Sequence, residues 1–401
     1  MKTKSNLVAL LLATAMLLSL AACNSSKPAE PSKSPEVVPE SPEIGDVGDT
    51  GGVEDADGLV IESSVELLYA KNFTIDNCKG GYKLISIYDE QRFLVVPEGA
   101  EPPSGLDEDI IVVQQPLSDM LVSSTPVTSL ISAIGGLDHM TMVTFDIGSW
   151  YIQDVIDKME NGEIIFIGDQ RTPDYEILSA KKPALVIYST MLNSLPDVSE
   201  KLAELGIPVL VDQATYEGHP LARTEWVKLY GALFGLEEAA EEVFNRQVAV
   251  VDELTVDASL GKSAAIFYII SNGKFVVRNA GDYVVEMLRM AGGEYIFADM
   301  NPEDTGNTQM EGEAFFEVAY DADFIIYIHS MGGRPADLEA LVAINPILGE
   351  LKAVKEGNVW CTAPNFFQVV DTLGYMIKDI NVILTNTDPE LTELDYLFKL
   401  Q

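Results

Sequence analysis

Aromatic and arginine side chains recur in the loops that follow strand-like runs of this 401-residue chain. Aromatic rings at such positions could stack on a flat or aromatic chelate. Guanidinium groups could pair with carboxylates or with a net-negative ferric centre. The candidate ligand-binding residues are Trp150, Tyr151, Arg171, Arg278, Tyr283, His329 and Phe366. Each has a structural alternative, because a ring can pack in the core and Arg278 can cap a helix or pair with a carboxylate. The prediction therefore rests on the set as a whole.

Other chemistry has weaker support in the sequence. A hydrolase needs a placed nucleophile and base, but no Gly-x-Ser-x-Gly motif occurs, and Ser179–Lys182 matches Ser-x-x-Lys without its companion motifs. No glycine-rich phosphate loop is found. A Zn or Mn site needs about three histidines with acidic partners, and the chain has only His139, His219 and His329. These patterns favour a binding protein without a resident cofactor over an enzyme, and they leave binding of free Zn or Mn as a weaker alternative.

The first 23 residues indicate export. Lys2 and Lys4 precede an apolar run from Leu7 to Leu20, and two alanines supply the small residues that a signal peptidase requires. The boundary Leu20–Cys23 resembles the bacterial lipobox, in which the cysteine thiol receives a diacylglycerol before cleavage. We therefore expect a mature protein that begins at Cys23 and is anchored by lipid on the extracytoplasmic face of a bacterial membrane.

The segment after Cys23 and the charge of the chain limit its partners. Residues 24–58 are rich in Pro, Ser, Gly and acidic residues, a composition that predicts a disordered tether. The formal net charge of -38 argues against nucleic acid as a partner and leaves the lipid anchor as the only predicted membrane contact. Besides Cys23, only Cys78 and Cys361 are present, and a disulfide between them is neither required nor excluded by any pattern.

The elements that must position these side chains follow an α/β pattern. Residues 65–97 alternate like an N-terminal β-hairpin segment, and from Ile110 short apolar runs alternate with helical stretches. Pro220 opens a helical stretch that ends at Gly235, and Leu236–Leu254 follows without a helix breaker. At 1.5 Å per residue this second helix would be about 28 Å long, enough to connect two lobes. A second α/β set begins at Ala264.

The predicted fold is therefore α/β, with two βα lobes joined by one long interlobe helix. Ligands of such sheets bind at the carboxyl ends of the strands, which predicts a cleft between the lobes. The predicted parts are residues 1–22 as the leader, 23–58 as the lipidated tether, 59–219 as the N-terminal lobe, 220–256 as the helical pair and 257–401 as the C-terminal lobe.

Several blocks, in this order, resemble the substrate-binding proteins of ABC importers for iron–siderophore, haem and cobalamin-type ligands. They are Pro173–Ile187, His219–Trp226, Arg278–Tyr283, Asp321–Tyr327 and Ala353–Trp360. The resemblance implies a monomer that captures a chelate and delivers it to an ABC permease and its ATPase. A ferric siderophore is the first candidate ligand, with haem or a corrinoid as alternatives. A sensor or adhesin lipoprotein with the same fold stays open as another function.

The resemblance also implies one exposed glutamate in each lobe that docks on arginines of the permease. Glu176 falls on the N-lobe position, seven residues before Pro183. Glu313 is the C-lobe choice, but it stands nine residues before Ala322, so Glu311 and Glu317 remain alternatives. Rim carboxylates that face guanidinium groups would steer the encounter and fix its register.

Overall fold

The computed structural model describes residues 53–54, 59–88, 91–254, 261–329 and 333–401. Residues 51–401 form one compact unit. The predicted leader, Cys23 and most of the predicted tether lie outside the described residues. Val53–Glu54, which the sequence assigned to the tether, form strand β1 and pair with β2 (Val60–Ser64).

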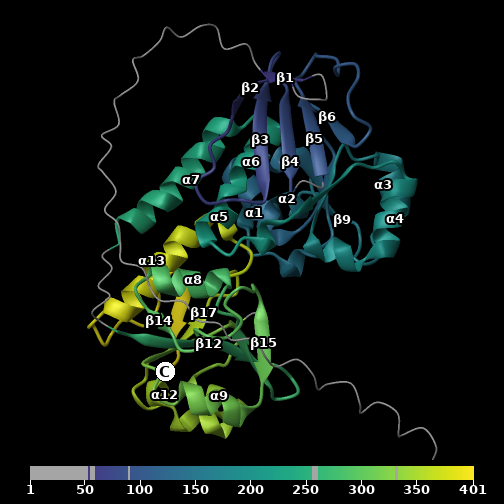
Figure 1. The fold of residues 1–401 in the computed structure, drawn as a ribbon. Coiled ribbons are helices and arrows are strands. Elements are labelled where there is room, and N and C mark those ends of the chain that lie inside the picture. The colour runs from purple at the N-terminus through teal and green to yellow at the C-terminus, as the bar shows by residue number, and fades with distance from the viewer. Residues whose placement is uncertain (1–52, 55–58, 89–90, 255–260, 330–332) are drawn as a thin grey trace, which may run out of the picture. The chain divides into compact units, whose positions relative to one another are not determined.

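The N-terminal segment is a six-stranded sheet rather than a hairpin (Figure 1). Its strands follow chain order and are antiparallel, except that β5 and β6 run parallel. After β1 and β2 come β3 (Phe73–Cys78), β4 (Lys83–Ile87), β5 (Gln91–Val96) and β6 (Ile110–Gln114). The prediction that Ile110 opens the βα units was therefore wrong. One face of this sheet joins the main core and the other covers a small cluster that includes Leu84, Leu94 and Ile110, so β5 and β6 have apolar side chains on both faces, like parallel strands.

The second sheet is parallel, with the strand order β11-β10-β7-β8-β9. Its strands are β7 (Met120–Ser123), β8 (Met140–Val143), β9 (Ile165–Phe166), β10 (Val186–Ser189) and β11 (Val209–Asp212). The connecting helices are α1 (Thr125–Ala133), α2 (Gln153–Glu160), α3 (Tyr175–Lys181) and α4 (Pro196–Glu204). The predicted α/β character of this lobe is confirmed.

The amide side chain of Gln91 joins the first two sheets. Its Oε1 accepts from the backbone N–H of Val211 at 2.9 Å, and its Nε2 donates to the Val211 carbonyl at 3.3 Å. Val211 lies in β11, at the edge of the parallel sheet. The start of β5 is thereby fixed beside the end of β11.

The third sheet forms the C-terminal lobe, with the order β15-β13-β12-β16-β17-β18 and with β14 beside β12. Its strands are β12 (Ser263–Ile269), β13 (Phe275–Arg278), β14 (Glu294–Tyr295), β15 (Asn307–Met310), β16 (Phe324–Tyr327), β17 (Val359–Thr362) and β18 (Leu397–Lys399). Its helices are α8 (Tyr283–Met290), α9 (Gly312–Ala319), α11 (Leu338–Ile344), α12 (Lys352–Lys355) and α13 (Leu373–Thr385). Parallel pairing of β12 with β16 and of β16 with β17 confirms the second α/β set.

Helices α5 (Pro220–Glu225), α6 (Val227–Phe234) and α7 (Glu237–Asp252) connect the two lobes. The 16 residues of α7 correspond to about 24 Å of helix. At its start, Glu237 pairs with Lys83 of β4 at 2.9 Å, and further along the Gln247 side chain accepts from the backbone N–H of Gly374 in α13 at 3.0 Å. Figure 1 shows α7 extending from the first sheet toward α13. The predicted interlobe helix is confirmed.

Two buried carboxylates attach the first sheet to α5. Glu225 accepts three backbone hydrogen bonds, from Leu68, Tyr69 and Ala70, each at 2.8 Å. Glu217 accepts from the next two backbone N–H groups, at positions 71 and 72, each at 3.0 Å. Five consecutive N–H groups of the segment before β3 are therefore satisfied by two side chains, which we call the carboxylate clamp.

The cysteines and helices of the described residues add two further findings. Cys78 lies in β3 and Cys361 in β17, and no disulfide joins them. None of the helices in the part of the chain that the structure describes is both long enough and apolar enough to cross a membrane.

Candidate functional site

The loops after the parallel strands of the second sheet carry the polar groups expected at a ligand-binding edge. Ser123 ends β7, and its hydroxyl lies 2.7 Å from the hydroxyl of Thr144, which follows β8; both side chains are buried. Ser124 caps α1 by accepting a hydrogen bond from the backbone N–H of Val127. The carboxyl edge of the sheet is thus held by local hydrogen bonds.

Gln368 connects this edge to the C-terminal lobe. Its Nε2 donates to the Ser149 carbonyl at 2.6 Å, and its Oε1 accepts from the backbone N–H of Tyr151 at 3.1 Å. The Tyr151 ring is exposed. The loop after β8 and the loop after β17 therefore meet, and the predicted candidate Tyr151 lies where the lobes meet.

Arg278 is buried without a full set of hydrogen-bond partners. Its residue exposure is 9%, and its Nε has no partner among the described residues. Nη1 lies 3.8 Å from Asp282 Oδ2, which already accepts from the backbone N–H of Gly306, and the guanidinium lies 5.0 Å from the centre of the Phe367 ring. A buried charged donor without a partner is costly in a folded protein, and such groups mark candidate binding sites.

Arg223 holds the loop after β11 against the C-terminal lobe. Its Nη2 donates to the Thr215 carbonyl at 2.7 Å and its Nε to the Glu217 carbonyl at 2.9 Å. The same guanidinium lies 3.7 Å from the centre of the Tyr283 ring in α8. Burial lowers the pKa of Arg223 from its ordinary value, although an arginine remains protonated.

Two predicted stacking residues are core residues. Trp150 is only 3% exposed, and its indole N–H donates to the Phe145 carbonyl at 3.2 Å. Phe366 is 1% exposed and packs edge-on against Phe367. Neither ring offers a face to a ligand in this structure, which corrects the prediction for both. Tyr283 is also buried, and one face of its ring is covered by the Arg223 guanidinium.

The other two candidates are Arg171 and His329. Arg171 is exposed, with Nη1 3.9 Å from Asp169. His329 follows β16, where its backbone N–H donates to the Thr362 hydroxyl at 3.0 Å. Burial lowers the pKa of His329, which favours the neutral ring, and its Nδ1 is buried without a partner in the described part of the chain. The structure brings Tyr151, Arg278 and Tyr283 toward the junction of the lobes and leaves Arg171 on the surface.

Sequence reasoning missed Gln368, one of the two side chains that join the lobes, because a lone glutamine in a loop carries no sequence signal. The other is Arg223, which stands in the block His219–Trp226. The sequence favoured a structural role for Arg223, within its helix or between the lobes, over a place in the cleft, and its contacts with the Thr215 and Glu217 carbonyls and with Tyr283 agree with a structural role.

The two predicted docking glutamates occupy equivalent positions. Glu176 is the second residue of α3, which precedes β10, and Glu313 is the second residue of α9, which precedes β16. Both side chains are exposed. Glu311 instead precedes the first residue of α9 and pairs with Lys274 at 3.1 Å, while Glu317 lies farther along α9. Position in the helix therefore favours Glu313 among the three candidates.

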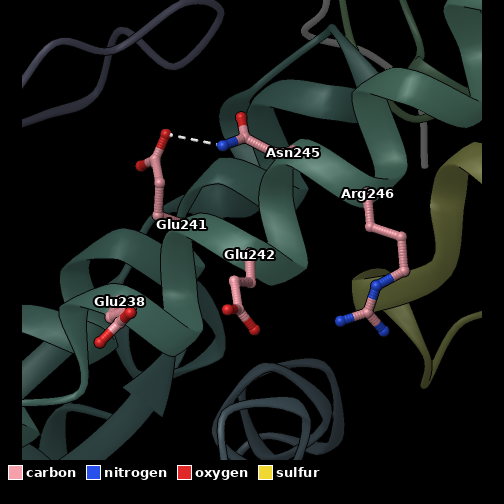
Figure 2. A pocket seen from close by; sticks show the side chains of 5 residues that line it. All are labelled: Glu238, Glu241, Glu242, Asn245 and Arg246. Atoms are coloured by element: carbon pink, nitrogen blue, oxygen red, sulfur yellow. Dashed lines mark hydrogen bonds between the residues drawn. The ribbon is translucent and has the colours of Figure 1, made fainter.

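A separate hollow lies along α7 (Figure 2). Its lining residues are Glu238, Glu241, Glu242, Asn245 and Arg246. It is mainly acidic, with Arg246 as its one basic side chain. Within the described ranges, no group of three or more His, Cys, Asp or Glu side chains is arranged to hold a metal ion.

The structure has two α/β lobes joined by a connecting helix, and the buried Arg278 at their junction lacks a hydrogen-bond partner for Nε among the described residues. This arrangement is that of a solute-binding protein. The periplasmic binding protein family matches residues 141–365, more than half of the chain, and the chain belongs to this family. This confirms the resemblance and the prediction that the chain is a binding protein rather than an enzyme.

Similar proteins agree with this assignment. The chain is 27% identical over 323 residues to an uncharacterized lipoprotein of Methanocaldococcus jannaschii, covering 76% of this chain and 75% of that one. A periplasmic haem-binding protein from Pseudomonas aeruginosa is similar in fold, with a TM-score of 0.55, 16% identity, and coverage of 71% of this chain and 98% of that one. A Fe3+-hydroxamate transport protein from Saccharomonospora viridis gives a TM-score of 0.53, 20% identity, and coverage of 68% and 94%.

Proposed function

We propose that this chain is the lipid-anchored solute-binding component of an ABC importer and that it captures an iron chelate. The observation that carries the proposal is Arg278, a buried guanidinium at the junction of the lobes whose Nε lacks a partner among the described residues. An anionic chelate would supply the missing acceptor. A ferric siderophore is the first candidate and haem is an alternative, in keeping with the names of the similar haem-binding and Fe3+-hydroxamate transport proteins. A corrinoid is a further alternative.

A binding screen tests the ligand class. The soluble form that begins at residue 24 is mixed with ferrichrome, a ferric tricatecholate, haemin or cyanocobalamin, and tryptophan fluorescence and the melting temperature are measured. One of these ligands should quench the fluorescence and raise the melting temperature, since binding to the folded state stabilises it. No response to any of the four would refute the ligand class.

An arginine pair separates recognition from general charge. Arg278→Ala should weaken binding of the ligand found in the screen about tenfold to a hundredfold, because a charge-assisted hydrogen bond contributes about 1.5–3 kcal/mol. Arg289 of α8 is the matched control, because it is exposed and pairs only with Glu286 at 3.3 Å among the described residues. Equal affinity of the two alanine variants would contradict a role for Arg278 in recognition.

Delivery to a permease is tested through Glu176 and Glu313. The double variant Glu176→Lys, Glu313→Lys should abolish uptake in cells while the purified protein keeps its ligand affinity. Glu311→Lys is the control for a charge change in the same region, and it should leave uptake nearly unchanged. If the double variant supports normal uptake, the chain docks on the permease through residues other than Glu176 and Glu313.

The lipid anchor is tested at Cys23. Cys23→Ala should release the protein from the membrane fraction, because the thiol is the proposed attachment point. The released protein should bind ligand as well as the anchored protein does, since the binding residues lie in the folded lobes. Retention of Cys23→Ala in the membrane would contradict lipidation at this cysteine.

A further inference from the structure

Three exposed side chains gather beside the carboxyl end of the parallel sheet. Tyr88 directly follows β4, Met191 lies in the short helix η3 (Thr190–Ser194) after β10, and Tyr216 ends the short helix η4 (Ala214–Tyr216) after β11. The rings of Tyr88 and Tyr216 meet edge-on with their centres 6.5 Å apart. Their exposed fractions are 54% and 49%, and that of Met191 is 41%. We call these three residues the tyrosine rim.

Tyr216 stands on a loop that is fixed on both sides. The carbonyls of its neighbours Thr215 and Glu217 both accept hydrogen bonds from Arg223. The hydroxyls of Thr190 and Thr215 lie 3.0 Å apart, which joins η3 to η4 beside Met191. Because Arg223 also contacts Tyr283 of the C-terminal lobe, the loop of Tyr216 lies at the junction of the lobes.

Tyr88 is held in a conformation that a bulky residue rarely adopts. Its φ of 50° lies in the left-handed region, and its backbone N–H donates to the Asn72 carbonyl at 2.8 Å. Left-handed backbone is unfavourable for side chains other than those of glycine, asparagine and aspartate, and such strain concentrates at binding sites. The paired hydrogen bonds between Gln91 and Val211 fix the nearby start of β5 to β11.

From this arrangement we infer that the tyrosine rim is a ligand-recognition surface for a flat ring, contributed in part by the N-terminal sheet. The inference rests on the proposed function, since it deepens the identity of the chelate: one that carries an aromatic or macrocyclic ring, such as a tricatecholate or haem. Tyrosine presents an apolar face and a hydroxyl at its edge, and methionine sulfur makes favourable contacts with rings. Two fixed tyrosines therefore suit a rigid ring better than a flexible aliphatic hydroxamate.

Two variants test the rim without loss of folding. Tyr216→Ala removes an exposed ring, and Tyr88→Gly removes a ring at a position whose backbone conformation suits glycine. Each should weaken binding of haemin or the ferric tricatecholate about tenfold, which corresponds to one ring stacking interaction. Tyr216→Phe should retain the affinity of wild type, because it keeps the ring. Tyr88→Gly should melt at or above the wild-type temperature, so that weaker binding reports the lost ring and not unfolding.

Tyr320 provides the matched control. It is 47% exposed and meets Phe316 edge-on at 5.4 Å, so its setting is close to that of Tyr216, but it lies after α9 in the C-terminal lobe. Tyr320→Ala should bind both probes as wild type does.

The outcomes separate this inference from the proposed function. If wild type binds haemin or the tricatecholate and the rim variants bind it equally well, the inference is wrong and the proposed function stands. Binding of ferrichrome alone by wild type would likewise overturn the ring preference and leave the proposed function intact. If wild type binds none of the four probes, the proposed function fails and the inference fails with it.

Discussion

Replacing Glu225 with glutamine should show how strongly the carboxylate clamp holds the first sheet to the rest of the protein. The carboxylate is fully buried and accepts three backbone hydrogen bonds of 2.8 Å, and the ammonium group of Lys228 lies 3.2 Å from its Oε1. Glutamine has nearly the same shape but keeps only one acceptor oxygen and loses the charge. Its NH2 group would then face backbone N–H groups that need an acceptor.

The expected loss of stability follows from these contacts. Oε2 accepts from Tyr69 and Ala70, and Oε1 accepts from Leu68. At least one backbone donor therefore loses its acceptor, and leaving a buried donor unsatisfied costs about 1–3 kcal/mol. Breaking the buried ion pair with Lys228 adds to this cost, and loss of one partner of such a pair costs about 3–5 kcal/mol. Because the terms share one carboxylate they do not add fully, and we expect about 3–5 kcal/mol for Glu225→Gln.

Urea denaturation followed by circular dichroism measures this difference, and Glu241→Gln is the matched control. Glu241 is the other carboxylate near Lys228, at 3.3 Å, but its side chain is 52% exposed. Exposed ion pairs contribute about 0–1 kcal/mol, so Glu241→Gln should unfold close to wild type. Hydrogen exchange at residues 68–70 should also accelerate in Glu225→Gln and not in the control. Equal unfolding free energies for the two variants would refute the reasoning.

Two further predictions concern the junction of the lobes. Burial raises the pKa of Asp212 from 3.8 to about 6, although the hydrogen bond from Tyr230 opposes the shift. The folded state therefore keeps the Asp212 proton to higher pH than the unfolded chain does, so the free energy of unfolding falls as the pH rises from 3.8 to about 6. Asp212→Asn should remove part of this pH dependence. Urea titrations at several pH values measure the change. If the free energy of unfolding of Asp212→Asn depends on pH as strongly as that of wild type, the prediction is wrong. Gln368→Ala removes two hydrogen bonds that contribute about 1 kcal/mol each, so the free energy of unfolding should fall by about 2 kcal/mol or less. Hydrogen exchange of the Tyr151 amide should become faster. Unchanged protection of that amide would argue against the contact.

The alternation of helices and strands was sufficient to predict both α/β lobes and the helix between them. Residues 65–97 were predicted to be strand-like, but β6 was assigned to the βα units instead of to the N-terminal sheet. β5 and β6 are apolar on both faces, and a short apolar run of this kind can equally indicate a buried strand of a parallel sheet. Ala100 and Leu106, which lie between β5 and β6, pack against the cluster that contains Leu94 and Ile110, and no local pattern predicts that contact.

Candidate site residues were predicted with less success, for a physical reason. Loops after strands were the correct places to search, but a loop position does not determine whether a ring points inward or outward. Trp150 turned inward because its indole N–H finds the Phe145 carbonyl, whereas Tyr151, the next residue, is exposed. Gln368 joins the lobes through the backbone groups of Ser149 and Tyr151. Every residue has such backbone groups, so the residue types do not predict this contact, which depends on the three-dimensional fold.

The amide of Gln91 has a consequence for how copies of this protein can associate with one another. An edge strand with open N–H and C=O groups is a template for pairing with a strand from another molecule. The backbone N–H and C=O groups of Val211 are both hydrogen-bonded to the Gln91 side chain, in the way that a residue of a neighbouring strand would bond them. At Val211 the edge of the parallel sheet therefore has no open backbone group for a strand of another molecule, because of a contact within the same chain.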